Sequence, residues 1–406
     1  MKTFEQIADL ERRYLLGTYN RYPIALTRGK GVFLYDLEDR RYLDFVAGLG
    51  VNALGHAHPR IVKTIREQAG KLIHVSNLYY HEYQGELAEK LCTLSGGSSG
   101  MSRAFFSNSG TEAIEGSIKL ARLAGHRAGG EAKSRLVALE GSYHGRTFGA
   151  LSLTGQDKHR KGFEPLLEDV TFVKQNDVEG LRSAVNDNTC AIVLEPIFGE
   201  GGIYECSVEF LQECRTLADR HRAALVFDEI QCGLGRTGTI FAFQSFGVTP
   251  DIVAIAKPIA AGLPLGAFLA KEEFASAISP GQHGTTFGGG PLACRVALEF
   301  LAIVEEEKLL ENVSRVGAYL RQSLIDLVGK RAAAKEVRGR GFIQGIQLDI
   351  PARPIVDAAL AEGVLFNSTQ ETVVRFLPPF LLAEKHVDKG IRVLKKLLGR
   401  KTKVAA

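Results

Sequence analysis

The sequence predicts an α/β protein: a mostly parallel sheet sandwiched by helices, joined to a smaller α+β domain. Short apolar runs alternate with helical stretches from about residue 72 to 270, a pattern typical of parallel sheets. After Pro291 long helices dominate and strands become short. We therefore expect 1–60 to be an N-terminal segment that packs with the small domain, 61–290 to be the large domain, and 291–406 to be the C-terminal small domain.

The N-terminal 60 residues look irregular apart from one hairpin, in which two short strands within 28–45 meet at a Glu38-Asp39 turn. Pro59 is expected to open a helix that runs to about residue 70, because proline suits a first helical turn. His56 and His58 precede it and read as loop residues, since nothing nearby completes a metal-ligand set.

The large domain contains seven short apolar runs that read as buried strands. They lie at 104–106, 136–139, 170–173, 191–194, 224–227, 252–256 and 267–270. Helical spacing is found between them, at 111–124, 178–184 and 208–221. In the small domain we expect helices at 292–307, 312–327 and 384–398, with short strands near 341–348 and 373–377.

Composition excludes several classes of protein. A net charge of +4 with interspersed signs gives no nucleic-acid footprint, and no apolar run approaches the roughly 20 residues of a membrane span. The first 16 residues are charged throughout and lack a signal-peptide core. Six cysteines without a C-x-x-C pair suggest reduced thiols. We expect a cytoplasmic protein without a bound metal.

Two strand ends carry the most informative side chains. The run 224–227 delivers Asp228 and Glu229, and the run 251–256 delivers Lys257. Carboxyl ends of parallel strands form the crevice where ligands bind. A desolvated lysine has a lowered pKa and can attack a carbonyl, and an aspartate can keep a pyridine nitrogen protonated. The pair suits pyridoxal phosphate, although these two residues alone favour a capped turn and a surface lysine, and only the rest of the chain changes that balance.

A phosphate site is predicted at the start of the helix after residue 106. Ser109, Gly110 and Thr111 occupy its first turn, where unpaired N–H groups and the helix dipole favour an anion. An ordinary capped helix would look the same. With an aspartate and a lysine at other strand ends of the same sheet, the phosphate is the better interpretation.

Further loops offer polar groups to the same crevice. Tyr143 could lie on a planar ring and Arg146 could hold a carboxylate. Glu200 follows another strand, and Thr285 and Thr286 offer hydroxyls suited to a phosphate. Taken singly, each also fits an ordinary surface loop.

One motif favours a different class of protein. Residues 233–238, GLGRTG, match the G-x-G-x-x-G pattern of dinucleotide-binding oxidoreductases. In such sites the first glycine leaves the strand directly and the last opens a helix. Here five residues intervene and the segment that follows is not convincingly helical, so this alternative is the weaker one.

Taken together, these segments resemble the class III, pyridoxal-phosphate-dependent aminotransferases, and most of all the acetylornithine aminotransferase group. The matching segments span nearly the whole chain. They are GVNALGHAHP, LIHVSNLYY, FFSNSGTEA, KLAR, YHGRT, EPIFGEGG, FDEIQCGLGRTG, HGTTFGGGPLA, VRGRGFIQGI and VVRFLPP. The resemblance implies fold type I, pyridoxal 5'-phosphate as cofactor, and a homodimer with shared active sites.

The resemblance also implies roles for cofactor-binding residues. Lys257 would bind the aldehyde covalently and shuttle a proton, and Asp228 would pair with the pyridine nitrogen. Tyr143 would stack on the ring, and Thr286 would reach the phosphate of the partner subunit. The remaining cofactor-binding positions are Gly110, Thr111, Glu229, Ile230 and Gln231.

For the substrate, the resemblance implies that Arg146 grips a carboxylate and that Thr285 lines the pocket. Glu200 and Arg375 would form a switch: paired, they leave room for a long amine, and apart, they free the arginine for a second carboxylate. Tyr19 would contact the amino-acid end of the substrate.

Three positions depart from the family pattern, namely Ile114, Pro258 and Gly290, and none removes a group that the reaction needs. The expected reaction is transamination of N2-acetylornithine with 2-oxoglutarate, giving N-acetylglutamate 5-semialdehyde and glutamate in arginine biosynthesis. Alternative donors are ornithine, succinylornithine, 4-aminobutyrate and a carrier-bound aminoadipate semialdehyde. A structural or regulatory family member is a further alternative, against which the intact Lys257, Asp228 and Arg146 argue.

Overall fold

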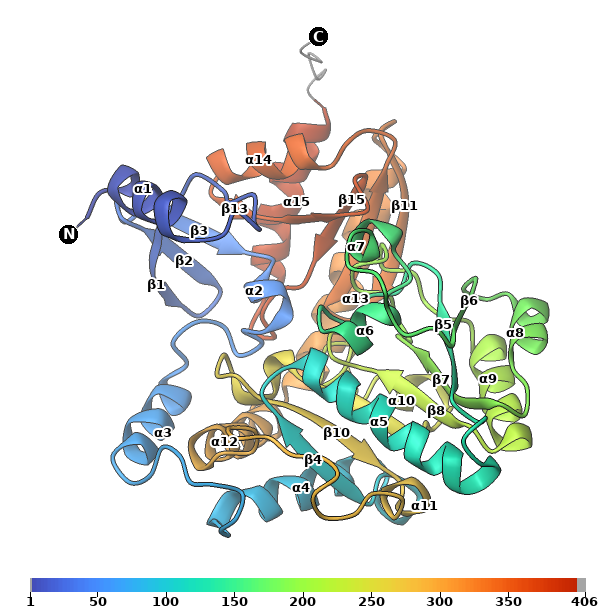
Figure 1. Ribbon diagram of the computed structural model, residues 1–406. Coiled ribbons are helices and arrows are strands. Elements are labelled where there is room, and N and C mark those ends of the chain that lie inside the picture. Colours follow the sequence, from blue (N-terminus) through green and yellow to red (C-terminus); the bar gives the residue numbers. More distant parts are fainter. Residues whose placement is uncertain (1, 400–406) are drawn as a thin grey trace.

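The computed structural model describes residues 2–399, and its centre is a seven-stranded sheet (Figure 1). The strand order is β4-β10-β9-β8-β7-β5-β6, and every neighbouring pair is parallel except those of β10, which is antiparallel to both neighbours. All seven predicted strands are present. Their bounds are β4 Arg103–Ser107, β5 Arg135–Leu139, β6 Val170–Val173, β7 Thr189–Leu194, β8 Ala224–Asp228, β9 Ile252–Ile255 and β10 Gly266–Ala270.

Helices cover both faces of this sheet. Alternate side chains of β8 point to opposite sides: Ala224 and Val226 belong to the core under α5 (Gly110–Gly129), whereas Leu225 and Phe227 belong to the core that includes α9 (Val208–His221). Because both faces are buried, the strands read as continuous apolar runs. The mostly parallel, helix-covered architecture predicted from the sequence is confirmed.

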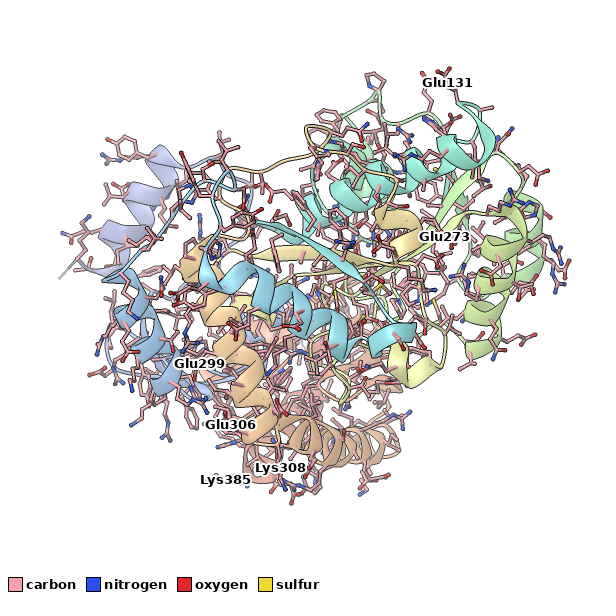
Figure 2. The ribbon with its side chains drawn as sticks, turned by 90° about the horizontal axis from the view of Figure 1, so that it is seen from below. Glu131, Glu273, Glu299, Glu306, Lys308 and Lys385 are labelled. Atoms are coloured by element: carbon pink, nitrogen blue, oxygen red, sulfur yellow. The ribbon has the colours of Figure 1, made fainter. Side chains whose placement is uncertain are left out.

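Shorter helices surround the large sheet. They are α3 Pro59–Ala69, α4 Glu82–Leu94, α6 Phe148–Ser152, α7 Asp157–Arg160, α8 Val178–Ala184, α10 Phe243–Phe246 and α11 Glu272–Ala275, with 3-10 turns at Gly97–Ser99 and Lys257–Ala260. Helix α3 contacts α12 (Pro291–Glu306) through Arg60, which pairs with Glu299 at 2.7 Å and Glu306 at 2.5 Å. Figure 2 shows both glutamates along α12.

The C-terminal part forms an antiparallel sheet, in the order β11-β12-β15-β14, against three helices. Its strands are β11 Ala334–Arg340, β12 Ile343–Leu348, β14 Asn367–Thr369 and β15 Val373–Phe376, and its helices are α13 Leu309–Val328, α14 Arg353–Ala361 and α15 Glu384–Leu398. A third sheet joins the two ends of the chain. Strands β1 Leu26–Lys30, β2 Phe33–Asp36 and β3 Arg41–Asp44 are extended by β13 Val364–Leu365, parallel to β3. The domain limits at 60 and 290 stay a prediction.

Several elements differ from the expectations. The N-terminus is not irregular, because α1 (Phe4–Tyr14) is fixed by a capping box in which Thr3 and Gln6 exchange hydrogen bonds. The hairpin turn at Glu38 and Asp39 is present, and the Asp36 carboxylate accepts the N–H groups of Glu38 and Arg40. Other elements not foreseen are α4, α6, α7, α10, α11, α14, β1, β11, β13, β14, the short α2 (Ala47–Gly50) and both 3-10 turns.

Three absences apply to residues 2–399. No helix there is long and apolar enough to cross a bilayer. No group of His, Cys, Asp and Glu side chains in this range could hold a metal ion. His56 instead pairs with Asp44 at 2.8 Å and His58 with Glu307 at 3.4 Å. The six cysteines form no disulfide.

Candidate active site

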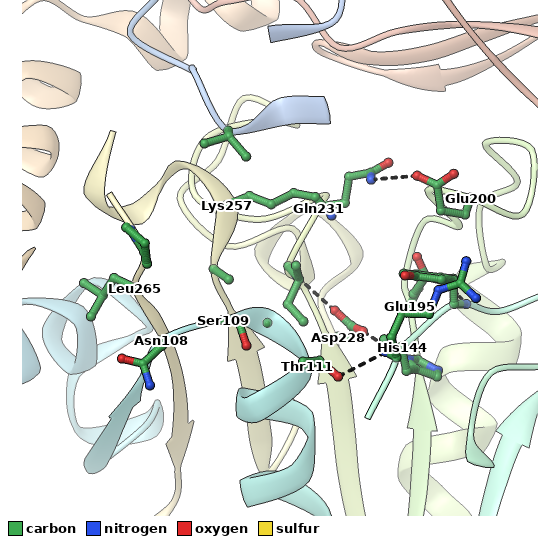
Figure 3. A pocket seen from close by; sticks show the side chains of 18 of the residues that line it. Asn108, Ser109, Thr111, His144, Glu195, Glu200, Asp228, Gln231, Lys257 and Leu265 are labelled. Atoms are coloured by element: carbon green, nitrogen blue, oxygen red, sulfur yellow. Dashed lines mark hydrogen bonds and ion pairs between the residues drawn. The ribbon is translucent and has the colours of Figure 1, made fainter. Parts of the chain in front are cut away.

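A cavity of about 440 Å³ opens at the carboxyl ends of the central strands (Figure 3). Its size lies within the range of small-molecule sites, roughly 300–1,000 Å³. Eleven of the residues that line it are polar or charged. They are Asn108, Ser109, Thr111, Tyr143, His144, Arg146, Glu195, Glu200, Asp228, Gln231 and Lys257, and Gly110 lines the cavity beside them. The strand ends named from the sequence therefore meet in one space.

Lys257 follows β9 and projects into this cavity. Its backbone has φ 44°, a left-handed conformation that residues other than glycine rarely adopt, so the surrounding structure must hold it there. Burial lowers the pKa of the amine, and the negative charges of Glu200 and Asp228 oppose this only in part. The side chain is therefore suited to act as a nucleophile and a base.

Asp228 ends β8 and is 4% exposed. Its Oδ2 lies 2.8 Å from Nδ1 of His144, and its Oδ1 accepts the N–H of Ile230 at 3.0 Å. Burial would lower the pKa of His144, but the hydrogen bond and charge of Asp228 outweigh it and raise that pKa. The pair holds a carboxylate and an imidazole ring together at the floor of the cavity.

Glu195 is a further buried carboxylate beside this pair. It accepts the N–H groups of Tyr143 at 2.8 Å and Gly199 at 2.9 Å. Burial, followed by the charge of Asp228, raises its pKa to about 7. Neither Glu195 nor His144 was foreseen as a site residue from the sequence. Glu195 directly follows strand β7, the same signal that pointed to Asp228 and Lys257.

The start of α5, where the sequence predicts an anion site, lines the cavity. Ser109 caps the helix by accepting the N–H of Glu112 at 3.3 Å. Gly110 is required there, because a Cβ would lie 2.8 Å from Cδ1 of Ile230. The Thr111 hydroxyl shares a hydrogen bond of 2.8 Å with Thr147. The free N–H groups of this first turn face the cavity that holds Lys257.

Glu200 and Arg375 are paired, with Nη1 of the arginine 2.6 Å from Oε1 of the glutamate. Arg375 is 1% exposed on β15, whereas Glu200 lines the cavity. Burial would raise the pKa of Glu200, but the charge and hydrogen bond of Arg375 hold it below its ordinary value. Gln231 joins the pair, with its Nε2 3.5 Å from the same carboxylate oxygen.

Of the other predicted site residues, some line the cavity and some do not. Tyr143, Ile230 and Gln231 line the cavity, as does the exposed Arg146, whose guanidinium lies 5.7 Å from the centre of the Tyr143 ring. Glu229 does not line it. Its carboxylate points to the opposite side of the strand and accepts the N–H groups of Ala242 and Phe243 at 2.6 and 2.7 Å. Its predicted role in cofactor binding therefore stays a prediction.

Three predicted residues lie outside this cavity. Thr285 lines a separate cavity of about 700 Å³ and accepts a 3.2 Å hydrogen bond from the Asn108 side chain. Thr286 is exposed. Tyr19 is 76% exposed and lines a third cavity of about 520 Å³, between the N-terminal segment and β13–β14. The departures Ile114, Pro258 and Gly290 also lie outside the main cavity: Ile114 and Pro258 are buried, and Gly290 caps α12.

The glycine-rich turn 233–238 does not form a phosphate loop. Residues 233–237 are buried, and a Cβ on Gly235 would lie 2.8 Å from the Phe380 ring. Arg236 within the turn is 1% exposed and donates to the carbonyls of Gly50 and Pro378. Because the small domain covers the turn, the interpretation as a dinucleotide site is wrong.

The donor set fits one cofactor in particular. A buried amine with a lowered pKa suits an aldehyde, the buried Asp228 suits a protonated ring nitrogen, and the start of α5 suits a phosphate. His144 Nε2 is also buried without a partner among residues 2–399, so it can face a bound ring. Fold and site together define a transferase of the pyridoxal-phosphate type.

The comparisons give the family. Residues 17–398 match the model of the class-III aminotransferases, and the chain belongs to that family. It is 45% identical over 390 residues to the acetylornithine aminotransferases of Caldanaerobacter subterraneus and Methanocaldococcus jannaschii, covering 96% of this chain and 98% and 97% of theirs. It is also similar to a solved ornithine aminotransferase from Toxoplasma gondii, described with PLP at its active site. That likeness has a TM-score of 0.91 at 30% identity and covers 98% of this chain and 95% of that one. The protein is thus a pyridoxal-phosphate-dependent aminotransferase.

Proposed function

We propose that this enzyme transfers the δ-amino group of N2-acetylornithine to 2-oxoglutarate, giving N-acetylglutamate 5-semialdehyde and glutamate in arginine biosynthesis. The observation that carries the proposal is the Glu200–Arg375 pair beside Lys257. While the Glu200 carboxylate covers the guanidinium, the site suits an amine substrate with one carboxylate. When that carboxylate moves away, the guanidinium can bind the second carboxylate of 2-oxoglutarate. The 45% identity to acetylornithine aminotransferases supports this donor over ornithine.

When bound, pyridoxal 5'-phosphate supplies an aldehyde that takes up the amino group and a ring that withdraws electrons. The protein holds and orients it. Lys257 takes a proton from the carbon that bears the amino group and later returns a proton to the cofactor side, a role that suits an amine whose pKa burial lowers. Asp228, fixed by His144, keeps a positive charge on the ring nitrogen favourable. Arg146 at the mouth binds the distal carboxylate of the substrate.

We further propose a cytoplasmic homodimer. Thr286 faces outward next to large exposed apolar side chains that a second copy would cover. These are Ile73, Leu78, Tyr79, Tyr80 and Phe287. The six unpaired cysteines support a reducing compartment.

A donor panel tests the proposal. Purified enzyme with 2-oxoglutarate should form glutamate fastest from N2-acetylornithine, judged by kcat/KM. Ornithine, succinylornithine and 4-aminobutyrate are the competitors in the same assay. A higher kcat/KM for any of these would overturn the assignment of the donor while leaving the aminotransferase class intact.

A further inference from the structure

One side chain holds the switch arginine and was not foreseen from the sequence. Asn367, on the edge strand β14, is the direct cross-strand neighbour of Arg375 on β15. Its Oδ1 accepts two hydrogen bonds from the guanidinium, from Nε at 3.0 Å and from Nη2 at 2.6 Å. One neutral oxygen thus occupies a whole edge of the guanidinium.

The opposite end of the guanidinium makes the exchangeable contacts. Nη1 donates to Glu200 Oε1 at 2.6 Å, to the Gly199 carbonyl at 2.8 Å and to Gln231 Oε1 at 3.2 Å. Only Glu200 among these acceptors carries a charge. If Glu200 swings away, Asn367 and the Gly199 carbonyl still hold the arginine, and the end of the guanidinium becomes free for a carboxylate of the substrate.

The same strand also fixes the other member of the switch. Thr369 lies two residues after Asn367, hence on the same face of β14, and its hydroxyl donates to the Glu200 carbonyl at 2.7 Å. Gln370 donates to the same carbonyl at 2.7 Å. With its main chain held, Glu200 can leave Arg375 by rotation of its side chain alone.

An asparagine suits this position better than an apolar or an acidic residue. An apolar side chain would leave Nε and Nη2 buried without an acceptor, a costly state for a charged group. A carboxylate would pair with both and neutralise the arginine permanently. We propose that Asn367 is a positioning residue: it holds Arg375 in place without giving it a permanent negatively charged partner. The arginine can therefore bind the 2-oxo acid once Glu200 has moved. This inference rests on the proposed function.

The two half-reactions, followed separately by rapid mixing, test the proposal. In holoenzyme carrying Asn367→Asp, the half-saturating concentration of 2-oxoglutarate should rise about tenfold or more, and far more than that of N2-acetylornithine. Ser368→Ala is the matched control, because Ser368 lies on the opposite face of the same strand and should leave both half-reactions within about twofold. Equal effects of Asn367→Asp on both half-reactions would overturn the proposal.

A second pair of variants tests the charge directly. Glu200→Ala should impair the N2-acetylornithine half-reaction, because it leaves Arg375 uncovered. Adding Asn367→Asp to Glu200→Ala should restore that half-reaction by about tenfold, since the new carboxylate supplies the missing charge. A double variant no faster than Glu200→Ala would contradict the proposal.

Binding provides a readout that does not depend on turnover. Glutarate, a dicarboxylate without a reactive carbonyl, should bind Asn367→Ala holoenzyme about tenfold more weakly than wild type in calorimetry. Unchanged binding would overturn the inference. The proposed function fails separately, if the wild-type enzyme takes no amino group from N2-acetylornithine.

Discussion

Two arginines of this protein are equally buried, and they differ in what faces their charge. Arg236, in the glycine-rich turn, donates only to backbone carbonyls, and burial lowers its pKa to about 9. Its guanidinium packs 4.7 Å from the centre of the Phe380 ring. Arg375 faces the carboxylate of Glu200, a side chain at the wall of an open cavity. Fixed backbone acceptors indicate a structural role for Arg236, whereas a side-chain acceptor at the cavity wall suits Arg375 to the proposed exchange of partners.

A substitution in the cavity should affect activity and not stability, and Lys257→Ala should show the largest effect. Lys257→Ala should lower transamination at least about a thousandfold, because it removes both the nucleophile and the acid–base group. The melting temperature should stay close to that of wild type, since the lysine side chain projects into the cavity and not into the apolar core. Steady-state kinetics and thermal unfolding measure the two effects. Residual activity within tenfold of wild type would show that Lys257 is not the reacting amine.

A substitution in the buried glycine-rich turn should instead lower stability without a selective effect on either half-reaction. Arg236→Met should lower the free energy of unfolding by about 2–4 kcal/mol, because the carbonyls of Gly50 and Pro378 lose their buried donor. The remaining activity should change equally in both half-reactions. Guanidinium chloride unfolding gives the stability, and rapid mixing gives the half-reactions. A selective loss of the 2-oxoglutarate half-reaction would contradict the distinction between the two arginines.

A smaller effect concerns the buried Glu195. Its pKa is about 7 in the folded protein, above the ordinary 4.5, so the folded state binds the proton more tightly between these values. The associated stability is present below pH 4.5 and is lost as pH rises through about 7. Between pH 5 and 8 wild type should therefore lose about 1–3 kcal/mol of unfolding free energy relative to Glu195→Gln. Chemical unfolding at both pH values measures this difference, and parallel curves for the two proteins would refute it.

A feature of this protein could be predicted from the sequence when residues close together in the chain determine it. The strands of the large sheet are buried on both faces, so their apolar runs and the residues at their ends could be read directly, as for Asp228 and Lys257. Glu229 was expected near the cofactor, but its carboxylate accepts the N–H group of Ala242 on the other side of the strand, because neighbouring side chains alternate across a strand. That alternation was available in the sequence, as was the capping box of Thr3 and Gln6.

Other features could not be read from local patterns. Strand β14 has three residues without an apolar run, and the role of Asn367 follows from its pairing opposite Arg375. His144 becomes informative only when the fold brings its ring against Asp228, 84 residues away in sequence. The outward positions of Thr286 and Tyr19 depend on what covers the surface of one chain. Local periodicity does not show which distant segments pair or which surfaces a second subunit covers, so these features could not be predicted from the sequence.

The central claim is that the amine at the end of β9 carries the cofactor. Treating the purified holoenzyme with borohydride and mapping its peptides by mass spectrometry tests this most directly, because reduction fixes the cofactor on the amine that holds it. The added mass of a reduced pyridoxal phosphate should appear on the peptide that contains Lys257. The same mass on another lysine, or no modified lysine at all, would contradict it.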